Sequence, residues 1–413
     1  MTPWGADDGY EAQALLGRTI LQVVPALDGS PASVASVAVA AALAEAGARA
    51  LVAGAPGPLV SELQARGGVF LAFGAAGKKP HGFVNPLTAA LNRLRLERLT
   101  AREGAELIHV RSRLVANAGF YAARQARIPL VANYDGERPG VHTIYGRGGD
   151  LLAQSDCIIA ANQAAAQHAV KLHPELASRV HIGQRGIDLH DFAADLVDVA
   201  RVHRLRAAWG VKAHERLVVI APCLPEQWDG VLAAAALLLA KGSLDNEAQE
   251  VRFVLLERDA QPEAGGFEAA AERLGLSGRV LRRACAERAD RAAAFLAAAA
   301  VIVAPSGEPG FIADAAVEAQ ALGVPVVLVE GEALGAGLLL APPEVDADSR
   351  TGWHVRPGQP QALARALEEA LRLGAAARET LSQNARAHAR TFSVERMCAQ
   401  TLAIYARRLC GPN

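Results

Sequence analysis

Two carboxylates stand beside turn-forming residues after a short apolar run in the last third of the chain. Val301–Val303 is β-branched and apolar, which is typical of a strand buried on both faces. Glu308 lies in the Gly- and Pro-containing loop that follows, and Glu318 lies in the predicted helix 312–322 beyond it. Carboxylates can accept hydrogen bonds or protons, and open parallel sheets bind ligands at the carboxyl ends of their strands. The loop after Val303 is therefore the part of this segment expected to face a ligand.

The residues after the helix predict the fold that must position these candidates. Gly323 is well placed to end the helix. Val324–Val329 is a second buried-strand run, with Pro325 near its start, where the missing N–H does least harm. The segment is thus a β-α-β unit, and a similar unit near the start of the chain comprises strand 19–24, helix 33–46 and strand 50–53. Repeated units of this kind predict an α/β protein with parallel sheets.

Composition sets the broad class of the protein. A chain of 413 residues is long enough for two domains, and 51% hydrophobic with 21% charged residues is typical of a globular protein. The net charge of −1, without a basic block at either end, argues against nucleic acid as the main partner, because phosphate binding needs concentrated positive charge. No signal peptide or membrane-spanning run is apparent. We therefore expect a cytoplasmic protein.

The cysteines and acidic residues give no pattern of metal ligands. The cysteines are odd in number, lack Cys-x-x-Cys spacing and are predicted to be reduced thiols; they are Cys157, Cys223, Cys285, Cys398 and Cys410. The carboxylates of 346–348 lie in a polar insertion and not in a strand-end loop. Serine-hydrolase, Walker and HExxH motifs do not occur in the sequence. We expect no metal and no cofactor.

The segment around the two glutamates resembles the signature of a known family. Glu308-Pro309, followed by Val317–Val326 (VEAQALGVPV), is similar to the donor motif of the family 4 type of GT-B glycosyltransferases. In that family a Glu facing the donor sugar is followed, after seven residues, by a Glu that binds the ribose of the nucleotide-sugar. Glu318 matches the second position, whereas Gly310 stands at the first. The resemblance implies that Glu318, Gly310 and Phe311 belong to the donor site, with Glu308 as a replacement for the missing Glu.

The resemblance runs from Leu21 to Tyr405 and implies an architecture. GT-B proteins have two Rossmann-like parallel β-α-β domains that face each other across a cleft, and a C-terminal helix that crosses back to the first domain. The domains expected here are an acceptor-side domain over 1–190, a donor-side domain over 191–390 and a tail helix within 391–413.

Several positions in the implied cleft depart from the family pattern. Relatives have a Gly-Gly pair in the first loop, a His-Gly pair after a later strand, and an Arg and a Lys that hold the donor diphosphate. The residues at these positions are Ser30, Pro31, Asp135, Gly136, Cys223 and Asp229. Each charge-assisted contact to a phosphate is worth about 1.5–3 kcal/mol. Losing two of them costs about 10²–10⁴ in donor binding or rate.

Two functions remain open on this basis. The first is a retaining, nucleotide-sugar-dependent glycosyltransferase in cell-surface glycan or lipopolysaccharide assembly, acting on a glycan or lipid-linked acceptor. Asp135 and Glu308 are then the catalytic candidates, and the candidate cations for the donor are Arg185, Arg258 and Arg111. The second is a catalytically silent pseudo-glycosyltransferase that serves as a binding or regulatory partner.

Two further features have competing interpretations. The predicted helix 86–103 carries Arg95, Arg98 and Arg102 on one side, with leucines 87, 91 and 94 nearby. It is either a solvated helix with its leucines in the core or a basic amphipathic surface for weak contact with anionic lipid at the inner face of a membrane. His109, at the end of a predicted strand, is expected to be a packed, hydrogen-bonded residue and not a base, because no acid or nucleophile accompanies it in the sequence.

Overall fold

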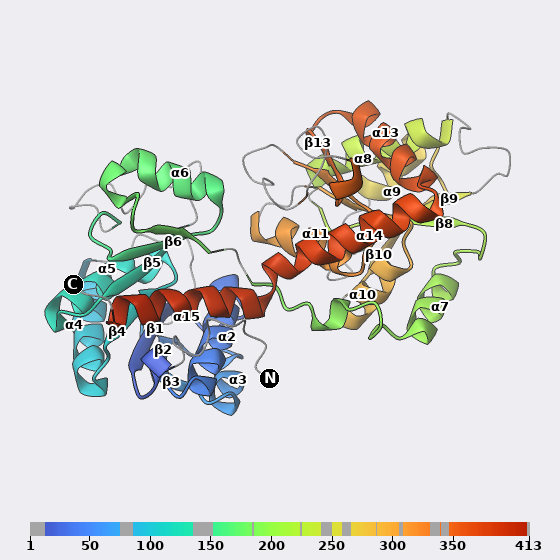
Figure 1. The fold of residues 1–413 in the computed structure, drawn as a ribbon. Coiled ribbons are helices and arrows are strands. Elements are labelled where there is room, and N and C mark those ends of the chain that lie inside the picture. The colour runs from blue at the N-terminus through green and yellow to red at the C-terminus, as the bar shows by residue number, and fades with distance from the viewer. Residues whose placement is uncertain are drawn as a thin grey trace. The chain divides into compact units, whose positions relative to one another are not determined.

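The chain divides into two compact units in the computed structural model (Figure 1). Unit 1 comprises Met1–Gly186 with Val394–Asn413, and unit 2 comprises Ile187–Ser393. The residues that the structure describes are 13–74, 86–134, 152–183, 186–223, 225–240, 250–257, 266–285, 287–304, 309–330, 339 and 347–410.

Unit 1 is built on a parallel sheet of seven described strands. They are β1 (Thr19–Ala26), β2 (Arg49–Ala55), β3 (Val69–Ala72), β4 (Leu107–Val110), β5 (Leu130–Tyr134), β6 (Cys157–Ala160) and β7 (Val180–Ile182). Their spatial order is β3-β2-β1-β4-β5-β6-β7, and all neighbouring strands are parallel. The strand order reverses between β1 and β4, which is the point where doubly wound sheets bind ligands at their carboxyl edge.

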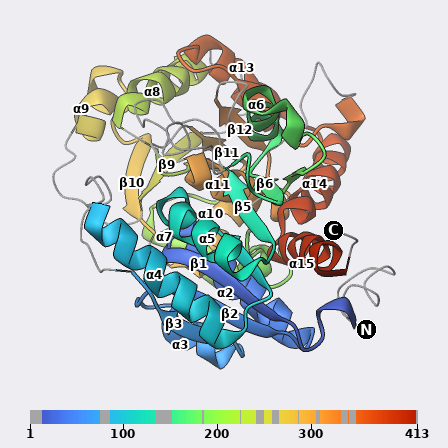
Figure 2. The ribbon, with the colours of Figure 1, turned by 90° about the vertical axis from the view of Figure 1, so that its left-hand side faces the viewer.

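Helices cover both faces of this sheet. They are α2 (Pro31–Glu45), α3 (Val60–Ala65), α4 (Pro86–Glu103), α5 (Arg113–Ala126), α6 (Gln163–Leu172) with the 3-10 turn η2 (Pro174–Leu176), and α15 (Val394–Cys410). The helices α4 and α5 lie side by side on one face (Figure 2). The opposite face is covered by α2 and α15, whose apolar residues share one core with those of β1. The C-terminal helix is therefore a structural part of unit 1.

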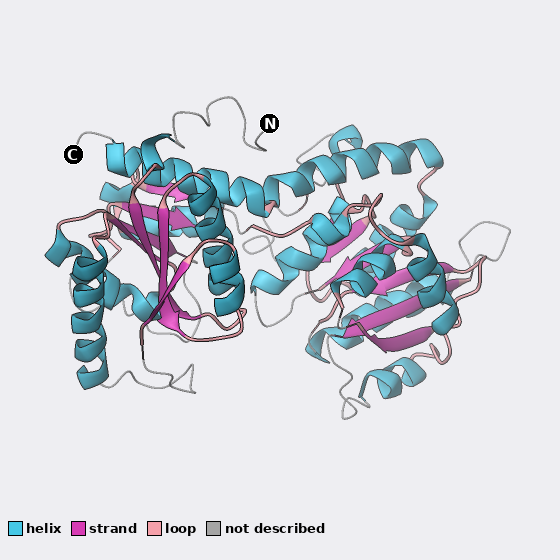
Figure 3. Cartoon of the chain, turned by 90° about the horizontal axis from the view of Figure 1, so that it is seen from below, coloured by secondary structure: helices cyan, strands magenta, loops and turns pink. Residues whose placement is uncertain are grey.

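Unit 2 repeats the arrangement with six described strands. They are β8 (Arg216–Ile220), β9 (Val251–Glu257), β10 (Val280–Ala284), β11 (Ala300–Val303), β12 (Val326–Val329) and β13 (Trp353–Val355). The spatial order β10-β9-β8-β11-β12-β13 is parallel throughout and reverses between β8 and β11. Figure 3 shows helices around each group of strands. The expected α/β class with two Rossmann-like parallel sheets is confirmed.

The helices of unit 2 divide between two cores, one on each face of the sheet. They are α7 (Val199–Ala208), α8 (Pro225–Ala240), α9 (Gly266–Arg273), α10 (Arg288–Leu296), α11 (Pro309–Ala321), α13 (Pro360–Arg372) and α14 (Ala375–Ala389), with 3-10 turns η3 (His190–Phe192), η4 (Ala347–Ser349) and η5 (Arg390–Phe392). Residues of α10 and α11 pack on one face, and residues of α8, α9 and α13 pack on the other.

Two helices begin earlier than the sequence predicts. We expected a loop over 222–230, but α8 begins at Pro225. We expected the next site helix to begin at Ile312, but α11 begins at Pro309. In both cases a proline at the first helical position needs no N–H partner and has its φ already set for a helix. The consequence is that Asp229 and Gly310 are helical residues, not loop residues.

Helix α4 corrects the interpretation of its leucines. Leu91 and Leu94 are 45% and 46% exposed, whereas Leu96 is the buried contact. Arg95, Arg98 and Arg102 are also exposed. The helix therefore presents a face on which exposed leucines and arginines are mixed, and the leucines at 91 and 94 are not core residues.

Candidate functional site

The buried carboxyl group of Glu318 is the centre of the candidate site. Helix α11 follows β11, a core strand beside the point where the order of the unit 2 sheet reverses. Glu318 lies in the third turn of α11 and is 1% exposed. Its Oε1 accepts a hydrogen bond of 2.6 Å from Nη2 of Arg291 on α10, but its Oε2 has no hydrogen-bond partner in the described part of the chain. Because buried polar atoms are nearly always paired, this oxygen is the one available to a ligand hydroxyl.

Two arginines of α10 hold Glu318 in place. Nη1 of Arg288 is 3.8 Å from Glu318 Oε1. Nε of the same arginine donates a hydrogen bond of 2.9 Å to Asp191 Oδ2. The guanidinium carbons of Arg288 and Arg291 lie 5.2 and 5.6 Å from the centre of the Phe192 ring, within the range of cation–π attraction. Burial raises the pKa of the Glu318 carboxyl, and the Arg291 guanidinium opposes that rise. Our sequence interpretation missed both arginines, although their i, i+3 spacing placed them on one face of a helix.

Glu330 is a second buried carboxyl at the same edge of the sheet. It follows β12 directly and continues the pairing with β13, since its N–H donates to the Val355 carbonyl. The side chain is 2% exposed, and its Oε2 has no hydrogen-bond partner among the described residues. Burial raises the pKa of Glu330 from its ordinary value of 4.5 to about 7. The sequence contained a signal that we did not use: a charged residue directly follows a run of four apolar residues, and the structure shows all four to be buried.

Cys223 is neutral at the position where relatives have an arginine. It follows β8 and is half-buried. Burial, with the nearby Glu257 carboxylate, raises the pKa of the thiol to about 12. Glu257 at the end of β9 pairs with Nε of Arg282 at 2.5 Å. The Arg282 cation beside Glu257 is therefore already paired with a carboxylate.

Asp229 lies on the exposed side of α8. The Asp229 side chain is 81% exposed and lies 3.5 Å from Nη2 of Arg273 on α9. Its neighbour Trp228 is buried instead and packs edge-on against Phe267. The two predicted clamp positions thus differ in their surroundings, since Cys223 is half-buried and Asp229 is exposed.

Arg111 lies in the core of unit 1. Its guanidinium is buried, and Nε donates to Gln22 Oε1 at 2.7 Å. His109 is fully buried beside it and bonds through Nδ1 to the Tyr405 hydroxyl (2.5 Å) and through Nε2 to Asn133 Oδ1 (2.7 Å). Burial, reinforced by Arg111, holds the pKa of His109 well below its ordinary value. The prediction of a packed, hydrogen-bonded His109 is confirmed.

The remaining predicted residues are not described at the level of side chains. Asp135, Arg185, Arg258 and Glu308 lie outside the described residues. For Gly310 and Phe311 the structure gives only their place in the first turn of α11.

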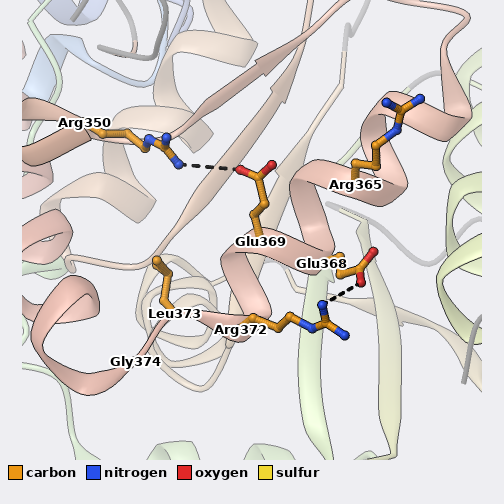
Figure 4. A pocket seen from close by; sticks show the side chains of 7 residues that line it. All are labelled: Arg350, Arg365, Glu368, Glu369, Arg372, Leu373 and Gly374. Carbon is orange, nitrogen blue, oxygen red and sulfur yellow. Dashed lines mark ion pairs between the residues drawn. The ribbon is translucent and has the colours of Figure 1, made fainter. Parts of the chain in front are cut away.

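Two hollows of the surface, one in each unit, are lined by residues other than Glu318 and Glu330. One, of about 460 Å³, is in unit 2 (Figure 4) and is lined by Arg350, Arg365, Glu368, Glu369, Arg372, Leu373 and Gly374. Its charges are largely paired, Arg372 with Glu368 at 3.1 Å and Arg350 with Glu369 at 3.6 Å. Another, of about 470 Å³, lies in unit 1 and is lined by residues of α5, of the segment that joins α5 to β5 and of the start of β5, among them Arg124 and Leu130, and by Gln154 and Asp156. None of the predicted site residues lines either hollow.

The cysteines, the possible metal ligands and the helices limit the chemistry that the described residues can support. All five cysteines are free, as predicted. Within the described ranges, no three His, Cys, Asp or Glu side chains gather in a way that could hold a metal ion. No described helix is both long enough and apolar enough to cross a membrane.

Comparisons with known proteins agree with the resemblance seen in the sequence. Residues 32–191 match the family described as Glycosyltransferase Family 4, and residues 218–372 match Glycosyl transferases group 1. A D-inositol 3-phosphate glycosyltransferase from Xylanimonas cellulosilytica is 29% identical over 334 residues, which are 76% of this chain and 75% of that protein. A protein with the same description from Jonesia denitrificans is 26% identical over 326 residues, 73% of this chain and 72% of its own.

Solved structures share the fold at low identity. A glycosyltransferase from Rickettsia africae superimposes with a TM-score of 0.77 at 16% identity, covering 96% of this chain and 100% of its own. An Anabaena protein crystallised with UDP and glucose superimposes with a TM-score of 0.68 at 20% identity, covering 94% and 99%.

Proposed function

Because this chain belongs to the GT-B glycosyltransferases, with a family 4 domain followed by a group 1 domain, we propose that it transfers a glycosyl group from a nucleotide-sugar to a hydroxyl of an acceptor. The bond between the anomeric carbon and the diphosphate breaks, and the acceptor oxygen forms the new glycosidic bond with retention of configuration. Unit 2 takes the donor role and unit 1 the acceptor role in this proposal, and no metal ion is required.

The unpartnered Oε2 of Glu318 is the observation that carries the proposal. A buried carboxylate with one oxygen fixed by Arg291 and the other without a partner can accept hydrogen bonds from a ribose hydroxyl without further rearrangement. The buried Arg291 pair holds the carboxyl group in one orientation, so that little entropy is lost on binding. The position of Glu318 at the second Glu of the family motif supports the same role.

For the acceptor we propose a polyol hydroxyl. The two curated relatives are D-inositol 3-phosphate glycosyltransferases, which supports a cyclitol phosphate. Glycans and lipid-linked precursors of the cell surface also offer such hydroxyls and are the alternative acceptors. Purified protein should be incubated with UDP-glucose and each acceptor type, with release of UDP and the mass of the product as readouts. Release of UDP without a glycosylated product from any acceptor would contradict the transferase.

The role of Glu318 has a matched control within unit 2. Glu318→Gln removes the carboxylate that faces the ligand, and we expect it to weaken UDP-glucose and uridine binding alike, by about tenfold, since a hydrogen bond to a charged group is worth about 1.5–3 kcal/mol. Glu215 is a buried carboxylate paired with Arg252 at 2.5 Å at the other end of β8. Glu215→Gln should leave both affinities unchanged. Unchanged binding in Glu318→Gln would remove Glu318 from the site.

A pseudo-glycosyltransferase is the second candidate, and the neutral thiol at Cys223 favours it. With Glu257 beside the thiol and the charge of Asp229 turned toward Arg273, the diphosphate lacks the two cations that relatives supply. This candidate predicts that UDP-glucose binds no more than about tenfold more tightly than uridine, a difference of about 1.4 kcal/mol. Cys223→Arg should widen the difference. Turnover of UDP-glucose by the unmodified protein would eliminate this candidate.

We also propose weak contact of unit 1 with anionic membrane surfaces through α4. Arg95 and Arg98 are exposed beside Leu91 and Leu94, so that a basic and apolar face is available for such a surface. Attachment of this kind would keep the enzyme near lipid-linked acceptors on the cytoplasmic side.

A further inference from the structure

We propose that Glu330 binds a hydroxyl of the donor's glycosyl group. This inference rests on the proposed function and adds a sugar-recognising residue in unit 2. Its basis is a buried carboxyl group at the ligand edge of the sheet whose Oε2 has no partner among the described side chains.

The position of Glu330 follows from the register of the sheet. β12 lies directly beside β11, with Val303 opposite Leu328. Two residues beyond Leu328, Glu330 therefore stands at the level where the chain leaves β11 toward α11. Adjacent strands are about 4.8 Å apart. Glu330 is thus one strand away from the start of the segment that leads to Glu318.

The face of the sheet also agrees with this placement. Val326 and Leu328 belong to the core shared with α10 and α11, whereas Val327 and Val329 belong to the opposite core. Glu330 keeps the extended pairing with Val355 and so continues the first series. Its side chain therefore falls on the same face of the sheet as α11, the helix that carries Glu318.

The chemistry around Glu330 selects a neutral polar ligand. Burial is the cause of its shifted pKa, and no charged side chain on β11, β13 or α11 contributes to that shift. A carboxyl group that shares its proton near neutral pH can both donate and accept hydrogen bonds, which is what a sugar hydroxyl also does. An ionised carboxylate would repel a phosphate, and a buried unpaired charge is costly. A hydroxyl of the glycosyl group therefore fits this position better than the diphosphate.

The test compares UDP-glucose with UDP by titration calorimetry near pH 7. In the unmodified protein we expect UDP-glucose binding to exchange protons with the buffer, seen as a dependence of the enthalpy on buffer ionisation, and UDP binding to exchange fewer. Glu330→Gln should abolish the difference in proton exchange. Glu330→Leu should weaken UDP-glucose by at least about tenfold, the value of one hydrogen bond to a polar ligand group, and leave UDP within about twofold.

Thermal unfolding separates a ligand role from a structural one. Removing a buried carboxyl group that has no partner should raise the melting temperature of Glu330→Leu while donor binding falls, whereas a structural role predicts a lower melting temperature. If Glu330→Leu does not fold, Glu330→Gln carries the test through its proton exchange. Equal weakening of UDP and UDP-glucose, or of neither, would overturn the role of Glu330 alone. Failure of the unmodified protein to bind either compound would overturn the proposed function and this inference together.

Discussion

At the scale of single residues, the surroundings of each carboxyl group in unit 2 determine what it can do. Glu318 is buried but paired with Arg291, so its charge is stabilised and one oxygen remains for a ligand. Glu330 is equally buried without such a pair, so it holds its proton to higher pH. Asp229 is exposed, and its interaction with Arg273 is weakened by solvent. The same functional group thus has three chemical roles within one unit.

Glu330 predicts a pH dependence of stability. Its pKa in the folded protein, about 7, lies above the ordinary value of 4.5. The folded state therefore binds more protons than the unfolded state between these values, and the stabilisation from the protonated group is lost as pH rises from 4.5 through 7. Glu330→Gln should remove this loss, worth at most about 3 kcal/mol at about 1.4 kcal/mol per pKa unit. Urea unfolding at pH 5 and pH 8 measures the change in the free energy of unfolding. An equal change between the two pH values in the unmodified protein and in Glu330→Gln would contradict the prediction.

At the scale of secondary-structure elements, α15 is joined to the sheet of unit 1 by buried polar contacts. Tyr405 is fully buried and bonds to His109 on β4. Tyr405→Phe leaves that imidazole nitrogen unpaired, and we expect a loss of about 1–3 kcal/mol in the free energy of unfolding. Tyr121 on α5, whose ring lies 3.8 Å below the Arg93 guanidinium, forms no such hydrogen bond with the described residues, so Tyr121→Phe is the matched control and should change little. Equal stability of the two variants in urea would show that the Tyr405 hydroxyl does not hold α15.

The exposed face of α4 predicts salt-sensitive binding to anionic vesicles. Basic residues near such a surface contribute about 1 kcal/mol each, so micromolar to millimolar attachment is the expected range. Reversing Arg95 and Arg98 to Glu should abolish sedimentation with phosphatidylserine vesicles. The same reversals at Arg124 on α5 and at Arg127, directly after that helix, should have a smaller effect. Equal binding to neutral vesicles, or binding that survives high salt, would contradict an electrostatic contact.

The elements and the site differ in how far the sequence predicted them. The strands β11 and β12 could be predicted because a short uninterrupted run of apolar residues is typical of a strand buried on both faces of a parallel sheet. The starts of α8 and α11 were missed because each begins at a proline that we read as a turn. Glu318 was found through its motif. The pairing of Arg291 and the burial of Glu330 depend on contacts between elements far apart in the chain, which spacing alone does not determine.

At the scale of the whole molecule, the chain passes between the two units twice, and the two passages lie together. The Ile187 N–H donates to the Phe392 carbonyl at 2.8 Å. A Cβ on Gly186 would lie 2.7 Å from the Cα of Val394 and 2.9 Å from the Cβ of Met397. Gly186→Ala should therefore displace backbone and cost about 1–3 kcal/mol. Thermal unfolding measures this loss. Gly230 is the control, because nothing lies within 4 Å of its Cβ position, and Gly230→Ala should leave the melting temperature unchanged or raise it.

The assignment of α15 to unit 1 has a consequence for the order in which a ribosome can complete the protein. Unit 2 ends at Ser393, before the last helix of unit 1 has been synthesised. Its sheet can therefore close while unit 1 still exposes the apolar face that Tyr405 and its neighbours later cover. Residues of β1 and α2 are thus synthesised well before the helix that completes their packing. During translation, that uncovered face is the part of the nascent chain that most needs a chaperone.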